Sequence, residues 1–140
     1  MQSDTRLSWT LLLLRLSVFL VMLMWTLDKF VRPSHAAAIY ENFYFIGGLG
    51  NTPIYILGIL EMALILGFVV GFRKRWTYGA VLLLHGVSTL SSFKKYLAPF
   101  SDPNLLFFAA WPMLAACFAL YTLRDLDTRW TLSELMRSGT

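Results

Sequence analysis

One apolar run limits what this chain can fold into more than any other feature. It extends from Ile54 to Phe72 and contains a single charged side chain, Glu61, near its centre. A membrane-crossing helix needs about 20 consecutive apolar residues, so the run predicts a helix that crosses a bilayer. A carboxylate in hydrocarbon is costly unless it faces other helices and pairs with a second group. The position of Glu61 therefore predicts a buried partner on another helix.

The composition extends this prediction to the rest of the chain. Of the 140 residues, 57% are hydrophobic and only 14% are charged, and the mean hydropathy is +0.60. Soluble domains usually contain about 25% charged residues. Four long apolar runs use up nearly all of the length, so we expect one membrane domain over residues 1–140 and no separate soluble domain.

The order of apolar runs and breaking residues predicts an all-α fold, an integral membrane four-helix bundle. Proline and basic residues mark where the runs begin and end. Between the first two spans we expect a loop at the membrane interface, residues 34–51, that contains a short aromatic helix. Pro112 predicts a kink inside the last span. The four spans are expected at residues 7–27, 54–72, 76–96 and 104–123.

Basic residues predict the orientation, because cytoplasmic loops carry an excess of Lys and Arg. The two termini and the turn between the second and third spans hold seven basic residues, whereas the opposite side holds four. Both termini are therefore expected on the cytoplasmic side. Arg73, Lys74 and Arg75 would anchor this topology and attract anionic lipids.

Three ionisable residues inside the spans predict a buried polar centre. With 1.5 Å of rise per residue, Arg15 and His85 would lie about 12 Å from the cytoplasmic face and Glu61 about 16 Å. A guanidinium holds a carboxylate in a bidentate fork, so we expect Arg15 to pair with Glu61. Ser88 and Trp111 would complete this centre.

Several interpretations of the polar centre stay open. The Arg15–Glu61 pair either fixes helix packing or helps to line a pocket for a quinone head group, a lipid or a proton path. His85 is a hydrogen-bonded core residue, a group that binds a ligand or transfers protons, or a haem or metal ligand. Trp111 is either a packing residue or a ligand contact.

Other features narrow the range of functions. The single cysteine, Cys117, excludes an internal disulfide and a dithiol redox pair. No catalytic motif or metal-binding cluster occurs in the sequence, so we expect no independent enzyme activity, no metal and no covalently bound cofactor. The sequence pI of about 9.5 is explained by basic residues at helix ends rather than by nucleic-acid binding.

The order of several short motifs resembles the DoxX-like family of small four-helix membrane proteins. The first span contains Leu-Leu-Leu-Arg-Leu at residues 12–16, the second contains Gly-Ile-Leu-Glu at residues 58–61, and Asn104 opens the last. An exit motif follows the first span and consists of Trp25, Asp28, Lys29 and Pro33.

The resemblance implies a multi-pass protein of the bacterial inner membrane. It implies an accessory subunit of a membrane-bound, quinone-linked redox complex, with lipids and a larger membrane complex or further copies of the chain as partners. A quinone at the polar centre would fit this function. A non-redox assembly factor or chaperone is the alternative, followed by a small proton-coupled transporter.

Overall fold

The computed structural model describes residues 2–139, and within that range the chain is all-helical, without strands. The all-α prediction is therefore confirmed. The elements are seven α-helices and one 3₁₀ helix, namely α1 (Gln2–Val31), α2 (Pro33–Tyr44), α3 (Asn51–Val69), α4 (Lys74–Ser91), α5 (Phe93–Leu97), η1 (Asn104–Ala109), α6 (Ala110–Thr122) and α7 (Leu132–Ser138).

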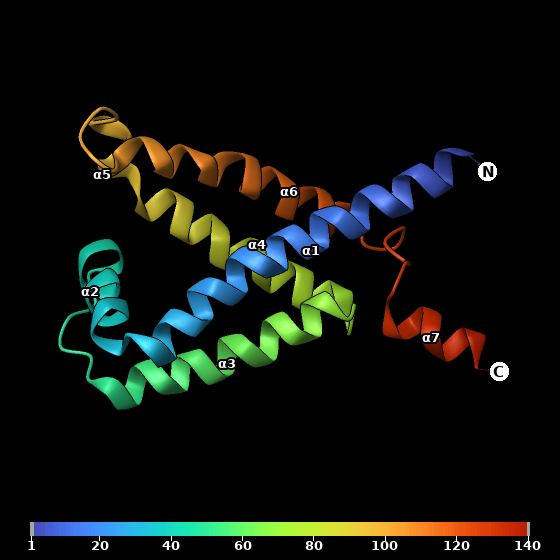
Figure 1. Cartoon of the computed structure of the whole chain (residues 1–140), viewed down its shortest axis with the longest axis horizontal. Helices are drawn as coiled ribbons and strands as arrows, with labels where there is room; N and C mark the ends of the chain where they lie inside the picture. The colour runs from blue at the N-terminus through green and yellow to red at the C-terminus, as the bar shows by residue number, and fades with distance from the viewer. Residues whose placement is uncertain (1, 140) are drawn as a thin grey trace.

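Four long helices, α1, α3, α4 and α6, pack together along their lengths. α1 lies against α3 and α6, and α4 lies against the same two helices. Both termini lie at one end of this assembly, beside α7, whereas α2 and α5 lie at the opposite end (Figure 1). We call these the terminal end and the α2 end.

In the part of the chain that the structure describes, three segments are long and apolar enough to cross a membrane, namely Asp4–Val31, Asn51–Val69 and Asn104–Thr122. α4 is less apolar, because it begins with Lys74 and Arg75 and carries His85, Ser88 and Thr89 on its later turns. The structure thus supports membrane association through three helices, whereas the third predicted span, residues 76–96, corresponds to the more polar α4, which packs against α3 and α6.

The helix boundaries differ from the predicted spans at several helix ends and at the prolines. The predicted interfacial loop contains α2, which starts at Pro33 because the first turn of a helix does not need that amide hydrogen. The third predicted span ends early at Ser91, and the short α5 follows it. Pro112 lies in the first turn of α6 after the 3₁₀ helix, so the predicted kink is instead a change of helix type.

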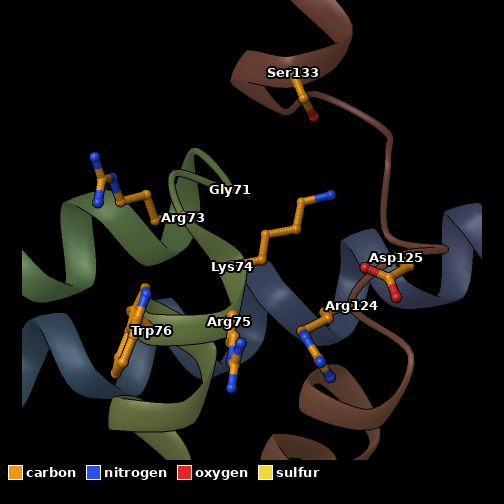
Figure 2. Close-up of a pocket in the computed structure, with 8 residues that line it drawn as sticks. All are labelled: Gly71, Arg73, Lys74, Arg75, Trp76, Arg124, Asp125 and Ser133. Carbon is orange, nitrogen blue, oxygen red and sulfur yellow. The ribbon is translucent and has the colours of Figure 1, made fainter.

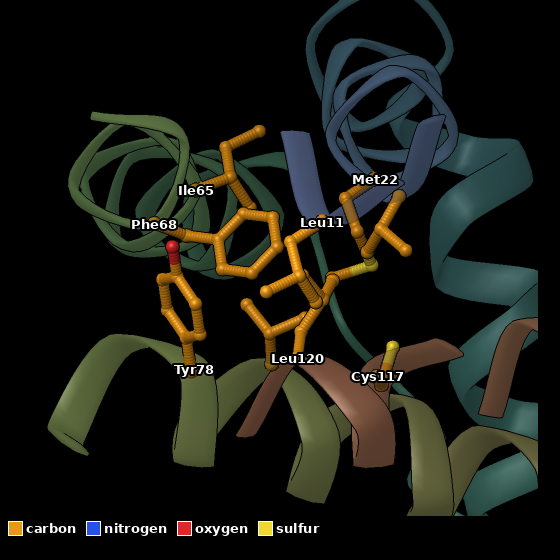
Figure 3. Packing of buried hydrophobic residues seen from close by; sticks show 9 residues of the cluster. Leu11, Met22, Ile65, Phe68, Tyr78, Cys117 and Leu120 are labelled. Carbon is orange, nitrogen blue, oxygen red and sulfur yellow. The ribbon is translucent and has the colours of Figure 1, made fainter. Parts of the chain in front are cut away.

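Apolar side chains from the four long helices meet in one core (Figure 3). Phe68 of α3 and Tyr78 of α4 form a ring contact there, with centroids 4.9 Å apart. The buried cluster comprises Leu11, Val18, Met22, Ile65, Phe68, Tyr78, Val81, Cys117 and Leu120.

The outer surface of the same helices is also apolar. Leu13 and Leu60 are each 63% exposed and Leu83 is 68% exposed. Large apolar side chains on both faces of a helix are typical of a helix that contacts lipid outside and protein inside.

Candidate functional site

Arg15 pairs with Asp127 and not with Glu61. Its Nη1 atom lies 2.5 Å from Asp127 Oδ1, and both side chains are almost fully buried. Its Nη2 atom donates to the carbonyl oxygen of Arg129 at 2.5 Å. The predicted Arg15–Glu61 pair is therefore wrong, although Arg15 does face inward and is compensated by a carboxylate.

Two further residues hold Asp127 in place. The Tyr78 hydroxyl donates to Oδ2 at 2.6 Å, so each carboxylate oxygen has a partner. The Lys74 ammonium donates to the backbone carbonyl of Asp127 at 2.5 Å. Burial lowers the pKa of Lys74 from its ordinary value, and the nearby Asp127 carboxylate opposes that shift. We call Arg15, Lys74, Tyr78 and Asp127 the Asp127 cluster.

The position of α1 explains why the predicted pair does not form. The first turns of α1 project past the α3–α4 turn at the terminal end (Figure 1). Arg15 therefore meets Tyr78, which lies only about 6 Å of helix rise from the start of α4. The prediction took Leu7 to lie level with the α3–α4 turn, and so it placed Arg15 level with His85 and Glu61.

Glu61 finds its partners on α1 nearer the α2 end. Lys29 Nζ lies 3.0 Å from Glu61 Oε2, and the Thr26 hydroxyl donates to Oε1 at 2.7 Å. The Glu61 side chain is 15% exposed. Thr26 lies about 16 Å of helix rise beyond Arg15 along α1, so the two carboxylate sites are separate.

The residues of the exit motif contact four different side chains, three of them through Asp28 and Lys29. Lys29 turns inward to Glu61, whereas Asp28 accepts a hydrogen bond from Arg32 at 2.7 Å and lies 2.6 Å from His35 Nδ1. Pro33 is the first residue of α2. These contacts fix the corner between α1 and α2.

Trp25, the remaining residue of that motif, contacts His85. Their rings stack with centroids 5.8 Å apart. His85 Nε2 lies 3.0 Å from the carbonyl oxygen of Ala110 and 3.3 Å from the Thr89 hydroxyl. His85 Nδ1 is buried and has no hydrogen-bond partner among the described residues.

Ser88 and Trp111 do not complete a shared centre. Within residues 2–139 the Ser88 side chain forms no hydrogen bond, and the Ser88 backbone carbonyl accepts one from the hydroxyl of Ser92. Trp111 is 45% exposed and packs against Tyr96, with ring centroids 5.5 Å apart. The predicted single polar centre is therefore three separate groups around Asp127, Glu61 and His85.

Sequence reasoning missed Asp127 because the last predicted span ends at residue 123 and Asp127 lies beyond it. The C-terminal segment, residues 123–131, instead folds back against the terminal end, where Leu132 N donates to the Val70 carbonyl at 2.8 Å. A weak signal was present, since Arg15 needs a counter-charge and Asp127 is one of eight acidic residues in the chain. Tyr78 lies within the third predicted span but was not among the residues of the predicted polar centre.

The predicted anchor residues lie beside an open pocket at the terminal end (Figure 2). The pocket has a volume of about 590 Å³. It is lined by Gly71, Arg73, Lys74, Arg75, Trp76, Arg124, Asp125 and Ser133. Within residues 2–139, no three His, Cys, Asp or Glu side chains gather closely enough to hold a metal ion.

No protein-family model, curated protein or solved structure matches this chain. The resemblance to the DoxX-like family therefore stays a prediction.

Proposed function

We propose that the chain is a non-catalytic accessory subunit of the bacterial inner membrane that packs beside a membrane-bound, quinone-linked redox enzyme. The observation that carries the non-catalytic part of this proposal is the pairing of Arg15 with Asp127 and of Glu61 with Lys29. Each carboxylate is compensated by a cation of the same chain, so the strongest buried charges act as packing contacts.

The proposal treats the four long helices as a four-helix membrane bundle. The apolar exterior, including Leu13, Leu60 and Leu83, supports contact with lipid or with partner helices. The terminal end carries the basic turn from Arg73 to Arg75, which supports its placement on the cytoplasmic side.

The redox partner comes from the family resemblance alone. In this proposal the quinone-linked chemistry belongs to the partner enzyme, because Arg15 and Glu61 do not meet to form the pocket that the sequence suggested. A proton path through Glu61 and His85 is also less favoured, since no hydrogen bond joins their two groups within residues 2–139.

Affinity purification of the full-length chain in mild detergent tests the partnership. We expect a membrane oxidoreductase with its flavin or haem to co-elute, and we expect quinone-dependent activity to fall when the chain is deleted. An enzyme that co-elutes but keeps its activity after the deletion would favour the assembly-factor alternative. Elution of the chain alone as a monomer would contradict the proposal.

The role of Glu61 can be separated from catalysis by substitution. Glu61→Gln should lower the amount of folded protein but leave the activity per assembled complex unchanged, because the carboxylate acts by pairing with Lys29. Glu41→Gln is the matched control, since Glu41 is an exposed glutamate on α2. Normal abundance with reduced activity per complex would instead assign Glu61 to quinone or proton chemistry.

A further inference from the structure

The pocket at the terminal end brings basic side chains together from separate parts of the chain. Arg73, Lys74 and Arg75 come from the α3–α4 turn and the start of α4, whereas Arg124 follows α6. The one carboxylate that lines the pocket is Asp125. The pocket therefore has an excess of positive charge.

Two of these basic side chains have no ion pair within the described chain. Neither Arg75 nor Arg124 forms an ion pair with a carboxylate in residues 2–139. Arg75 lies over the Trp76 ring at 5.8 Å, and Arg124 lies over the Tyr121 ring at 4.5 Å. These ring contacts hold the guanidinium groups in place but leave their charge available to an anion.

The orientation of the side chains indicates which residues would hold the anion. Arg75 and Arg124 point in the same direction from α4 and from the end of α6 (Figure 2). Lys74 points toward the part of the chain with Asp125 and Ser133, while Arg73 points away from the other basic side chains. Arg75 and Arg124 are thus the principal donors, and Lys74 adds positive charge.

The surroundings favour a lipid over a soluble anion. Trp76 lines the same pocket and is 68% exposed, and tryptophan is enriched at the membrane–water boundary. Basic pockets at that level bind lipid phosphates, and guanidinium groups bind phosphate through paired hydrogen bonds. A lipid would place its phosphate on the arginines and its glycerol and acyl parts beside Trp76.

We propose that this pocket is a binding site for the phosphate of an anionic membrane lipid, held by Arg75 and Arg124. The inference rests on the proposed membrane embedding but not on the proposed redox partner. It assigns a defined site to what the sequence suggested only as general attraction between the basic turn and anionic lipids.

Two measurements on the full-length protein test the site. Native mass spectrometry from detergent counts retained lipids after addition of phosphatidylglycerol, phosphatidylcholine or inorganic phosphate at equal phosphate concentration. Thermal unfolding is followed in parallel with a thiol-reactive dye, because the single cysteine, Cys117, is buried in the core. We expect one retained phosphatidylglycerol and a rise in unfolding temperature with that lipid only.

Substitutions then locate the site. Arg75→Gln and Arg124→Gln should each weaken phosphatidylglycerol binding by about fivefold, the loss expected for one basic residue near an anionic membrane. Arg75 is exposed, so its substitution should not impair folding. Lys94→Gln, an exposed cation outside this pocket, is the matched control and should bind phosphatidylglycerol as the unmodified chain does.

The outcomes are distinct. If Lys94→Gln weakened phosphatidylglycerol binding as much as the pocket substitutions do, the site would be overturned, and the binding would reflect general attraction between basic surface residues and anionic lipid. Equal stabilisation by inorganic phosphate would overturn the lipid as occupant. Equal retention of phosphatidylcholine and phosphatidylglycerol by the folded protein would overturn the inference alone. Failure of the purified protein to enter phosphatidylcholine vesicles in a separate reconstitution would overturn the proposed membrane embedding.

Discussion

At the scale of single residues, the buried charges behave as two independent contacts. Arg15 and Asp127 join α1 to the C-terminal segment, and Lys29 and Glu61 join α1 to α3. Removing one partner of such a pair leaves a buried charge without compensation, which costs more than the pair itself contributes.

Asp127→Asn should destabilise the protein strongly, by about 3–5 kcal/mol, because it leaves the Arg15 guanidinium buried and unpaired. The unfolding temperature measured by dye labelling of Cys117 should fall. Asp125→Asn is the control, since Asp125 is exposed two residues away, and a change within about 0.5 kcal/mol is expected there. Similar effects of the two substitutions would contradict the buried ion pair.

The pair between α1 and α3 can be tested by exchanging its charges. Lys29→Glu and Glu61→Lys should each reduce the amount of folded protein, because each places two like charges in contact. The double variant should recover part of that loss, with a coupling energy of about 0.5–3 kcal/mol between the two positions. Additive losses in the double variant would show that the two side chains do not interact.

At the scale of elements, the docking of the C-terminal segment against the α3–α4 turn depends on Gly71. This glycine has φ +70°, and a Cβ atom there would lie 2.8 Å from Thr131 Cγ2. Thr131 is fully buried. A larger residue at position 71 would therefore push the C-terminal segment outward.

Gly71→Ala should lower the free energy of unfolding for two reasons. Backbone strain should contribute about 1–2 kcal/mol, and overpacking against Thr131 should contribute about 1–3 kcal/mol. Limited trypsin digestion should then cleave after Arg124 or Arg129 faster than in the unmodified chain. Gly48→Ala provides the control, because Gly48 has φ +74° but open space where the Cβ would lie. Equal protection of the C-terminal segment in both variants would contradict its docking through Gly71.

At the scale of the whole molecule, both termini and the α3–α4 turn lie at one end (Figure 1). The basic residues of that end outnumber those of the other side by seven to four. The proposed orientation of the assembly in the membrane therefore rests on a small excess of basic residues at one end.

Replacing Arg73, Lys74 and Arg75 with glutamine leaves four basic residues on each side, so we expect a mixture of orientations. Green fluorescent protein and alkaline phosphatase fused in turn to the C-terminus report the cytoplasmic and external populations. The unmodified chain and a Lys94→Gln/Lys95→Gln control should show only the cytoplasmic signal. Phosphatase activity from the unmodified chain would contradict the proposed orientation.

The sequence by itself determined the helical content, the need to compensate the charges of Arg15 and Glu61, and the interior position of His85. Apolar runs and the cost of burying a charge are local properties, so they can be read along the chain. All three residues are largely buried, as those costs require.

Only the tertiary structure decided which groups compensate them. The projection of α1 past the α3–α4 turn places Arg15 beside Tyr78, and the folding back of residues 123–131 delivers Asp127 to it. The projection of α1 and the folding back of residues 123–131 both depend on how helices of unequal length pack. The hydrophobic periodicity of a single helix does not reveal how far that helix is offset from its neighbours. The local sequence shows that a buried charged side chain needs a partner. Which residue becomes that partner depends on packing between distant parts of the chain.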